Sequence, residues 1–268
     1  MLLTMVAVVA GVVGLAVGSF VNVVAHRVPL GLSVTRPPSA CPGCGAAIGP
    51  RDNIPVVSWL LLGGKCRACG MGIGVRYPLV ELATAGLWAA TPYVVGLTAM
   101  LPAYLWFFSV TIALVATDLE HHRLPNRIVL HGTWVGLLLL AGGALLGGIE
   151  PVRIGHAITG GAAWFALMLA IALVARGGFG FGDVKVAFLL GAFVSFQPGL
   201  ADAEWFDALG SAGVAIVGSF LIGGVVAIGL MVSRRTDRRA EMAFGPAMIA
   251  ASWIAVVWGD RLLAAWLG

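Results

Sequence analysis

The chain has 268 residues, of which 60% are hydrophobic and only 10% are charged. Soluble globular proteins carry roughly a quarter charged residues, so this chain lacks the polar side chains that would cover a water-facing surface. The net charge of +4 does not indicate nucleic-acid binding. The basic residues lie in short loops between apolar runs, where they orient a membrane protein.

Eight apolar segments, each close to the length that crosses a bilayer, follow one another along the chain. The first lacks a basic start and is longer than the apolar core of a signal peptide, so it is expected to be a retained helix. We therefore predict an all-α polytopic membrane protein with about eight transmembrane helices. The segments are predicted at 2–25, 79–98, 101–117, 128–148, 154–175, 184–200, 211–232 and 243–266.

The distribution of Lys and Arg predicts the orientation of these helices. All but Arg153 and Arg261 of the 16 basic residues fall in one set of loops. Positively charged loops stay in the cytosol, which places both chain termini outside an inner membrane. The last of these loops carries Arg234, Arg235, Arg238 and Arg239, which are expected to contact lipid headgroups.

Two aspartates mark the cytosolic ends of predicted helices at similar depth. Asp118 ends the third segment, and Asp183 opens the sixth. Acids at a membrane boundary are costly unless they have a partner or water, so they suggest function. Two carboxylates at close range cannot both ionise readily. Such a pair can activate a water for attack on a peptide carbonyl, with one group as base and the other as acid.

The motif around Asp183 contains two glycines and a lysine. Gly180 and Gly182 permit close backbone approach, so an extended substrate strand is expected to pair near the carboxylate. Lys185 completes the motif. The alternative interpretation is structural, because Asp183 and Lys185 can simply flank a helix start, and Asp118 can belong to a solvated loop.

All four cysteines lie in the polar loop 26–78, between the first two segments. The motifs CPGC and CRAC place them at Cys41, Cys44, Cys66 and Cys69. Two such pairs can surround one Zn²⁺ ion, and a cytosolic location disfavours disulfides. Since every metal position would be filled by cysteine, the zinc is predicted to be structural. Redox-active pairs and disulfides are the alternatives.

Five motifs in order resemble the bacterial prepilin peptidase family. They are GSFVNVVAHRVP at 18–29, the cysteine loop at 41–81, DLEHHRLPNRI at 118–128, GFGDVK at 180–185 and FGPAM at 244–248. The resemblance implies an aspartic endopeptidase of the cytoplasmic membrane that cuts the leader from type IV prepilins and pseudopilins at the cytosolic face. It assigns Asp118 and Asp183 as the catalytic pair.

The same resemblance implies a second activity. Family members with the cysteine loop also methylate the new amino terminus with S-adenosylmethionine, so the loop 26–78 is expected to serve methyl transfer. The core 79–268, after the first helix at 1–25, is then the peptidase. The chain departs from the family at Asn126, where an acid is common. No glycine-rich nucleotide loop identifies donor-binding residues.

Two other functions compete with the peptidase on the residues alone. An ion-coupled transporter would use Asp118 and Asp183 as a cation or proton site, but transporters place such acids nearer the midplane within repeated halves. A zinc-dependent membrane sensor or scaffold would leave both aspartates inert. Replacement of either aspartate by asparagine distinguishes these functions, because only the peptidase should lose cleavage.

Overall fold

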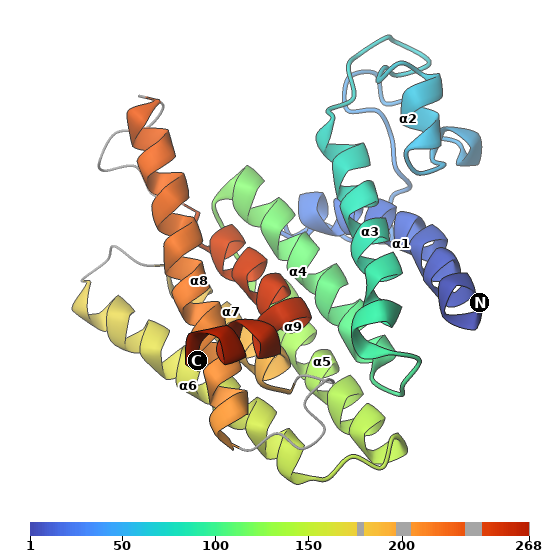
Figure 1. Cartoon of the computed structure of the whole chain (residues 1–268). Coiled ribbons are helices and arrows are strands. Elements are labelled where there is room, and N and C mark those ends of the chain that lie inside the picture. The colour runs from blue at the N-terminus through green and yellow to red at the C-terminus, as the bar shows by residue number, and fades with distance from the viewer. Residues whose placement is uncertain (176–179, 197–204, 234–242, 268) are drawn as a thin grey trace. The chain divides into compact units, whose positions relative to one another are not determined.

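The computed structural model describes residues 1–175, 180–196, 205–233 and 243–267, and these residues are almost entirely helical (Figure 1). Arg176, the end of the predicted sixth segment at 197–200, and Arg234, Arg235, Arg238 and Arg239 lie outside them. The helices in the described residues are, in chain order, α1 (Leu2–Arg27), η1 (Pro50–Asp52), α2 (Val57–Leu61), α3 (Arg76–Val95), α4 (Leu101–His121), α5 (Asn126–Leu146), α6 (Val152–Val174), α7 (Phe181–Phe196), α8 (Trp205–Val232) and α9 (Gly245–Leu267).

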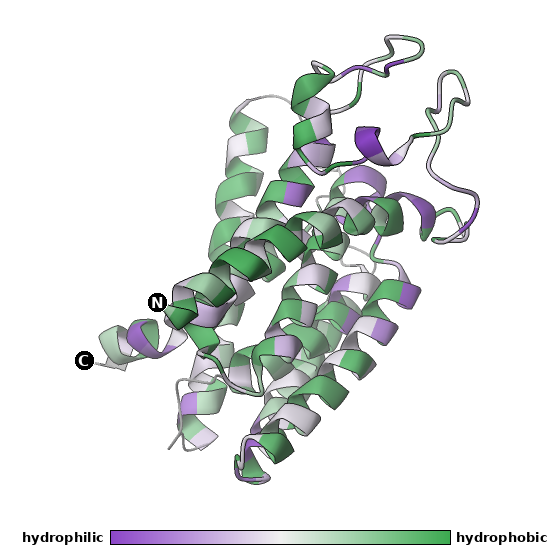
Figure 2. Ribbon diagram, turned by 90° about the vertical axis from the view of Figure 1, so that its right-hand side faces the viewer, coloured by the Kyte–Doolittle hydropathy of each residue, from purple (hydrophilic) through white to green (hydrophobic). Residues whose placement is uncertain are grey.

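Among the described residues, six helices are long and apolar enough to cross a membrane, namely α1, α4, α5, α6, α8 and α9. In Figure 2, which colours each residue by hydropathy, the long helices are mostly in the hydrophobic colours. The prediction of an all-α multi-pass protein is confirmed. The two remaining long helices, α3 and α7, are not among these candidate spans, for physical reasons. α3 carries the polar residues Arg76 and Glu81, and α7 has 16 residues, a length of about 24 Å, which is less than the hydrocarbon core of a bilayer.

The chain divides into two compact units, residues 1–93 and 94–268. In the first unit, α1 lies closely against α3. A Cβ added at Gly18 would approach the Glu81 Cα to 2.7 Å, so only glycine permits this contact. Near the end of α1, the Asn22 side-chain amide donates a hydrogen bond of 3.1 Å to the Tyr77 carbonyl. This contact is the helix-packing role expected for a polar residue inside an apolar helix.

The second unit is built around α7. Twelve of its residues, from Asp183 to Phe196, are buried. It contacts α5, α6, α8 and α9. A helix that is apolar on every side belongs in the interior of a bundle, which explains why the shortest of the long helices lies at the centre of this one. The crossing with α6 is close, because a Cβ at Gly191 would meet the Gly160 carbonyl oxygen at 2.5 Å.

Aromatic and polar contacts fix the helices that carry the two aspartates. The Phe107 ring of α4 stacks on the Phe193 ring of α7 with a centroid distance of 4.5 Å. The Tyr104 hydroxyl donates to the Phe193 carbonyl at 3.2 Å. One turn further along α4, the Trp253 indole of α9 donates to the Thr111 hydroxyl at 3.0 Å. α4, α7 and α9 therefore form one packed group.

Candidate active site and candidate metal site

Asp118 lies in the last turn of α4, three residues before the helix ends at His121. The predicted apolar segment stops at 117, but the helix continues to His121. It ends because His122 adopts a left-handed conformation with φ 48°, and its N–H donates to the Asp118 carbonyl at 2.9 Å. The carboxyl side chain is buried, with the residue only 5% exposed.

Asp183 lies in the first turn of α7. Its N–H donates to the Gly180 carbonyl at 3.1 Å, which begins the helix. The residue is 8% exposed. An acid in the first turn is favoured by the helix dipole, so the local sequence places Asp183 naturally at this end of α7.

The two carboxylates converge on the first residue of α9. A Cβ built on Gly245 would lie 2.8 Å from Asp118 Oδ2 and 3.5 Å from Asp183 Oδ1. Three helices that are distant in sequence therefore bring the two acids to one place, as the sequence analysis anticipated. Asp118 Oδ2 is buried and has no hydrogen-bond partner among the described residues.

Leu124 packs beside both aspartates, in the short connection between α4 and α5. A Cβ on Gly182 would lie 3.0 Å from the Leu124 Cβ, and a Cβ on Gly245 would lie 3.3 Å from its Cδ1. The role of Gly182 in the structure is therefore one of packing, and the strand pairing expected from the sequence stays a prediction. Gly182 provides the room in which the Leu124 side chain lies against the start of α7.

Lys185 and Asn126 form a contact next to the site. The Lys185 ammonium donates a hydrogen bond of 2.8 Å to the Asn126 side-chain oxygen. Asn126 is the first residue of α5, so this bond ties the start of α5 to the second turn of α7. The departure from the family pattern at Asn126 therefore falls on the partner of the motif lysine, and not on the carboxylate pair.

Sequence reasoning did not find Leu124 or Gly245 as members of the site. The signal for Gly245 was present in the motif FGPAM at 244–248, which falls at the start of the last helix. That motif has no titratable side chain, so nothing in its chemistry linked it to the aspartates. Only the packing of α9 against α4 and α7 reveals the contact.

The four cysteines come together in the first unit. The sulfur atoms of Cys41, Cys44, Cys66 and Cys69 all lie within 4.8 Å of one another, and those of Cys41 and Cys69 are 3.8 Å apart. All four are free thiols. A tetrahedral Zn²⁺ with bonds of about 2.3 Å would separate its sulfur ligands by roughly 3.8 Å, so the cluster has the dimensions of a metal site.

The two cysteine pairs are built in the same way. The N–H of Gly45 donates to the Cys41 carbonyl at 2.9 Å, and the N–H of Gly70 donates to the Cys66 carbonyl at the same distance. Both glycines have φ 72°, a conformation that favours glycine. The sequences CPGCGAAIG and CRACGMGIG show this local repeat, which the sequence analysis overlooked.

Backbone N–H groups also favour the metal-binding form of one thiol. Hydrogen bonds from the backbone of Cys44 and then of Gly43 lower the pKa of Cys41 to about 7. The thiolate is the form that ligates metals. The backbone therefore favours the ligating form of Cys41, whereas contact with the neighbouring thiols and burial raise the pKa of Cys69.

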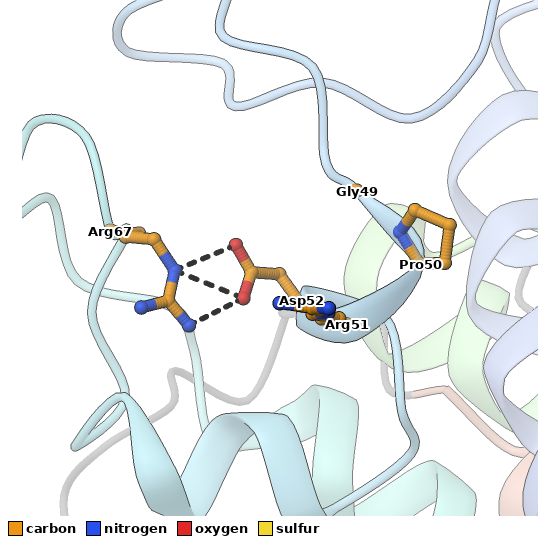
Figure 3. A pocket seen from close by; sticks show the side chains of 5 residues that line it. All are labelled: Gly49, Pro50, Arg51, Asp52 and Arg67. Carbon is orange, nitrogen blue, oxygen red and sulfur yellow. Dashed lines mark hydrogen bonds and ion pairs between the residues drawn. The ribbon is translucent and has the colours of Figure 1, made fainter.

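An ion pair connects the two halves of the cysteine loop (Figure 3). Arg67 donates from Nε and an Nη to the Asp52 carboxylate, with a shortest distance of 2.7 Å. These hydrogen bonds lower the pKa of Asp52. With Gly49, Pro50 and Arg51, the two residues line an open pocket of about 580 Å³.

Comparison with known proteins gives a consistent result along the chain. Residues 12–95 match the bacterial peptidase A24 N-terminal domain, and residues 105–232 match the type IV leader peptidase family. A prepilin leader peptidase/N-methyltransferase of Pseudomonas aeruginosa is 34% identical, with 95% of this chain and 91% of that protein covered. A protein of the same description from Bacillus subtilis is 34% identical, with 93% of each covered. No solved structure matches.

Proposed function

Because the chain belongs to the type IV leader peptidase family, we propose that it removes the leader peptide of type IV prepilins or pseudopilins, with Asp118 and Asp183 as the catalytic pair. The observation that carries this proposal is the approach of both carboxylates to Gly245. Both acids are buried, and they come from different helices. A structural role for either one does not require that they meet.

The chemistry follows from two acids that share one small space. Like charges at close range disfavour double ionisation, so one carboxyl keeps its proton. The ionised carboxylate takes a proton from water as the water oxygen bonds to the scissile carbonyl carbon. The protonated carboxyl donates to the carbonyl oxygen. Collapse of the tetrahedral intermediate breaks the carbon–nitrogen bond, and a proton moves to the leaving amine. The two acids titrate as a pair.

Replacement of each aspartate by asparagine tests the catalytic pair. A prepilin-like substrate is co-expressed with wild type, Asp118→Asn or Asp183→Asn, and its mass is measured. We expect either change to reduce cleavage by at least about 100-fold, since each removes a group needed for proton transfer. Asp260→Asn is the matched control, because Asp260 is exposed on α9 and should leave cleavage unchanged. Normal cleavage by both catalytic variants, at equal protein levels, would exclude the pair.

We propose that the four cysteines hold one structural Zn²⁺. The support is the spacing of their sulfur atoms and the matched geometry of the two pairs. With four thiolates as ligands, the ion has no open position for a substrate or water. Its contribution would be to hold the loop folded, since the ion joins two segments that contain little regular secondary structure.

We also propose that the protein methylates the new amino terminus with S-adenosylmethionine. The support is that its relatives are described as prepilin leader peptidase/N-methyltransferases and that the chain has the cysteine loop. The pocket beside Arg51 does not by itself fit the donor. Its lining residues include no aromatic ring for adenine, and the Asp52 carboxylate is already held by Arg67. No donor-binding residue is therefore assigned. The substrate mass in the cleavage assay also reports one added methyl group.

The proposed location is the cytoplasmic membrane, with the carboxylate pair facing the cytosol and both termini outside. The support is the concentration of Lys and Arg in one set of loops. Substrates with a basic leader and a hydrophobic helix would then approach from the cytosolic side, the side that the carboxylate pair is proposed to face.

A further inference from the structure

The first turn of α9 lies directly against the carboxylate pair. α9 packs against both α4 and α7, the helices that carry the aspartates. Its first residue is Gly245, and the direction in which a side chain would leave this residue points at Asp118 Oδ2 and Asp183 Oδ1.

Asp118 Oδ2 has an unfilled hydrogen-bonding requirement. It is buried without a partner among the described residues, in a side chain that is 95% removed from solvent. Buried polar atoms are almost always hydrogen-bonded to protein or to water, and leaving one unpaired is costly. A Cβ on Gly245 would lie 2.8 Å from this oxygen, so a side chain at position 245 would crowd the atom that lacks a partner.

We propose that Gly245 is a positioning residue for the reaction: because it carries no side chain, Asp118 Oδ2 can contact the reacting oxygen beside Asp183. The reacting oxygen is that of the attacking water or of the tetrahedral intermediate that it forms. This inference rests on the proposed function, and it adds a residue that contributes no titratable group.

A methyl group at this position would disturb both carboxylates. At 2.8 Å from Asp118 Oδ2, a Cβ is closer than real carbon–oxygen contacts allow, so the carboxylate would have to move. The methyl would also cover the face of Oδ2 that lacks a partner. A competing explanation for any defect is packing, because the same Cβ would lie 3.3 Å from Leu124 Cδ1.

Binding of an uncleavable pair of peptides separates these explanations. One peptide spans the junction between a basic leader and a hydrophobic helix and carries a hydroxyethylene group in place of the scissile amide. The other lacks only the hydroxyl. Because the hydroxyl imitates the reacting oxygen, the full-length protein should bind the first peptide about 10- to 100-fold more tightly, the range for hydrogen bonds to a charged group.

Gly245→Ala should reduce this preference to less than about 3-fold while the affinity for the peptide without the hydroxyl changes little. A packing defect would instead weaken the binding of both peptides equally, because the two peptides differ only by the hydroxyl oxygen. Gly224→Ala is the matched control, since Gly224 lies in α8 with open space around its Cα and should keep the full preference.

A second background removes the Leu124 contact. Gly245→Ala is introduced into the wild type and into the Leu124→Ala variant, and the loss of the hydroxyl preference that it causes is compared between the two. Equal loss of the preference in both backgrounds supports the proposal, and recovery in the Leu124→Ala background overturns it. If Gly245→Ala alone does not accumulate, the double variant, in which the crowding is relieved, carries the same test.

The aspartate variants distinguish failure of this inference from failure of the proposed function. If Asp118→Asn and Asp183→Asn lose cleavage and the hydroxyl preference while Gly245→Ala keeps both, only the role of Gly245 is wrong. If both aspartate variants cleave normally, the catalytic pair itself is wrong, and the inference about Gly245 is overturned with it.

Discussion

At the scale of single residues, the site depends on where side chains are absent as much as on where acids are present. Gly182 and Gly245 stand beside the two aspartates, and both face the Leu124 side chain. Leu124 precedes a proline, which favours an extended backbone and ends the connection before α5. This leucine therefore occupies a fixed place, and the starts of α7 and α9 are spaced around it.

Gly182→Leu tests this spacing. We expect the variant to insert normally but to lose cleavage by at least about 10-fold, because a side chain at 182 meets Leu124 at 3.0 Å and displaces the first turn of α7 with Asp183. The measurement is the rate of prepilin cleavage at matched membrane protein levels. Gly224→Leu, at an open position on α8, is the control. Wild-type rates in Gly182→Leu would show that the spacing does not matter.

At the scale of elements, the cysteine loop is organised by two equivalent turns. Each turn places a glycine with positive φ directly after its second cysteine, and the N–H of that glycine donates to the carbonyl of the first cysteine. The Asp52–Arg67 ion pair joins the segment after the first turn to the second turn. The loop thus has a repeated local structure, although it has little hydrophobic core of its own.

Replacement of Cys41 by serine tests the metal site. We expect purified wild type to contain about one zinc per chain and Cys41→Ser to contain much less, because an alcohol is a far weaker zinc ligand than a thiolate. Metal content is measured by elemental analysis. Ser58→Ala, in the same loop and outside the cluster, is the control for metal content. Equal zinc in Cys41→Ser and wild type would contradict coordination by the four cysteines.

Chelation of the metal gives a second result at this scale. A structural ion should protect the loop 26–78 from proteolysis without taking part in peptide-bond cleavage. We therefore expect chelated protein to be cut in the loop while the intact fraction still cleaves substrate. Immediate loss of cleavage in protein whose loop is still uncut would indicate a chemical role for the metal.

At the scale of the whole molecule, the helices that cross the membrane set which loops share a side. The positive-inside distribution predicts that the loop 26–78 and the turn at 122–125 both face the cytosol. The short helix α7 does not need a lipid-facing surface of its own, because the other helices of its unit surround it. Burial of α7 therefore explains why its length falls below that of an independent span.

Reporter fusions test this orientation. A phosphatase that is active only outside the cytosol is fused after Leu124, after Ile149 and after Gly268. We expect activity at 149 and 268 and none at 124. Of the eight predicted spans, three precede 124, four precede 149 and eight precede 268, so only the last two positions lie on the side of the amino terminus. A fluorescent protein that matures only in the cytosol should give the opposite pattern. Phosphatase activity at 124 would invert the predicted topology.

The sequence by itself determined the all-α membrane architecture, because apolar runs of bilayer length report directly on the surrounding solvent. It also selected the two aspartates and the four cysteines, since ionisable groups at a membrane boundary and paired thiols are chemically conspicuous. It could not place Gly245 or Leu124 at the site. Neither residue has reactive chemistry, and their importance comes from α4, α7 and α9 meeting at one end of a bundle. That convergence is a property of packing between distant segments, which only the tertiary structure decided.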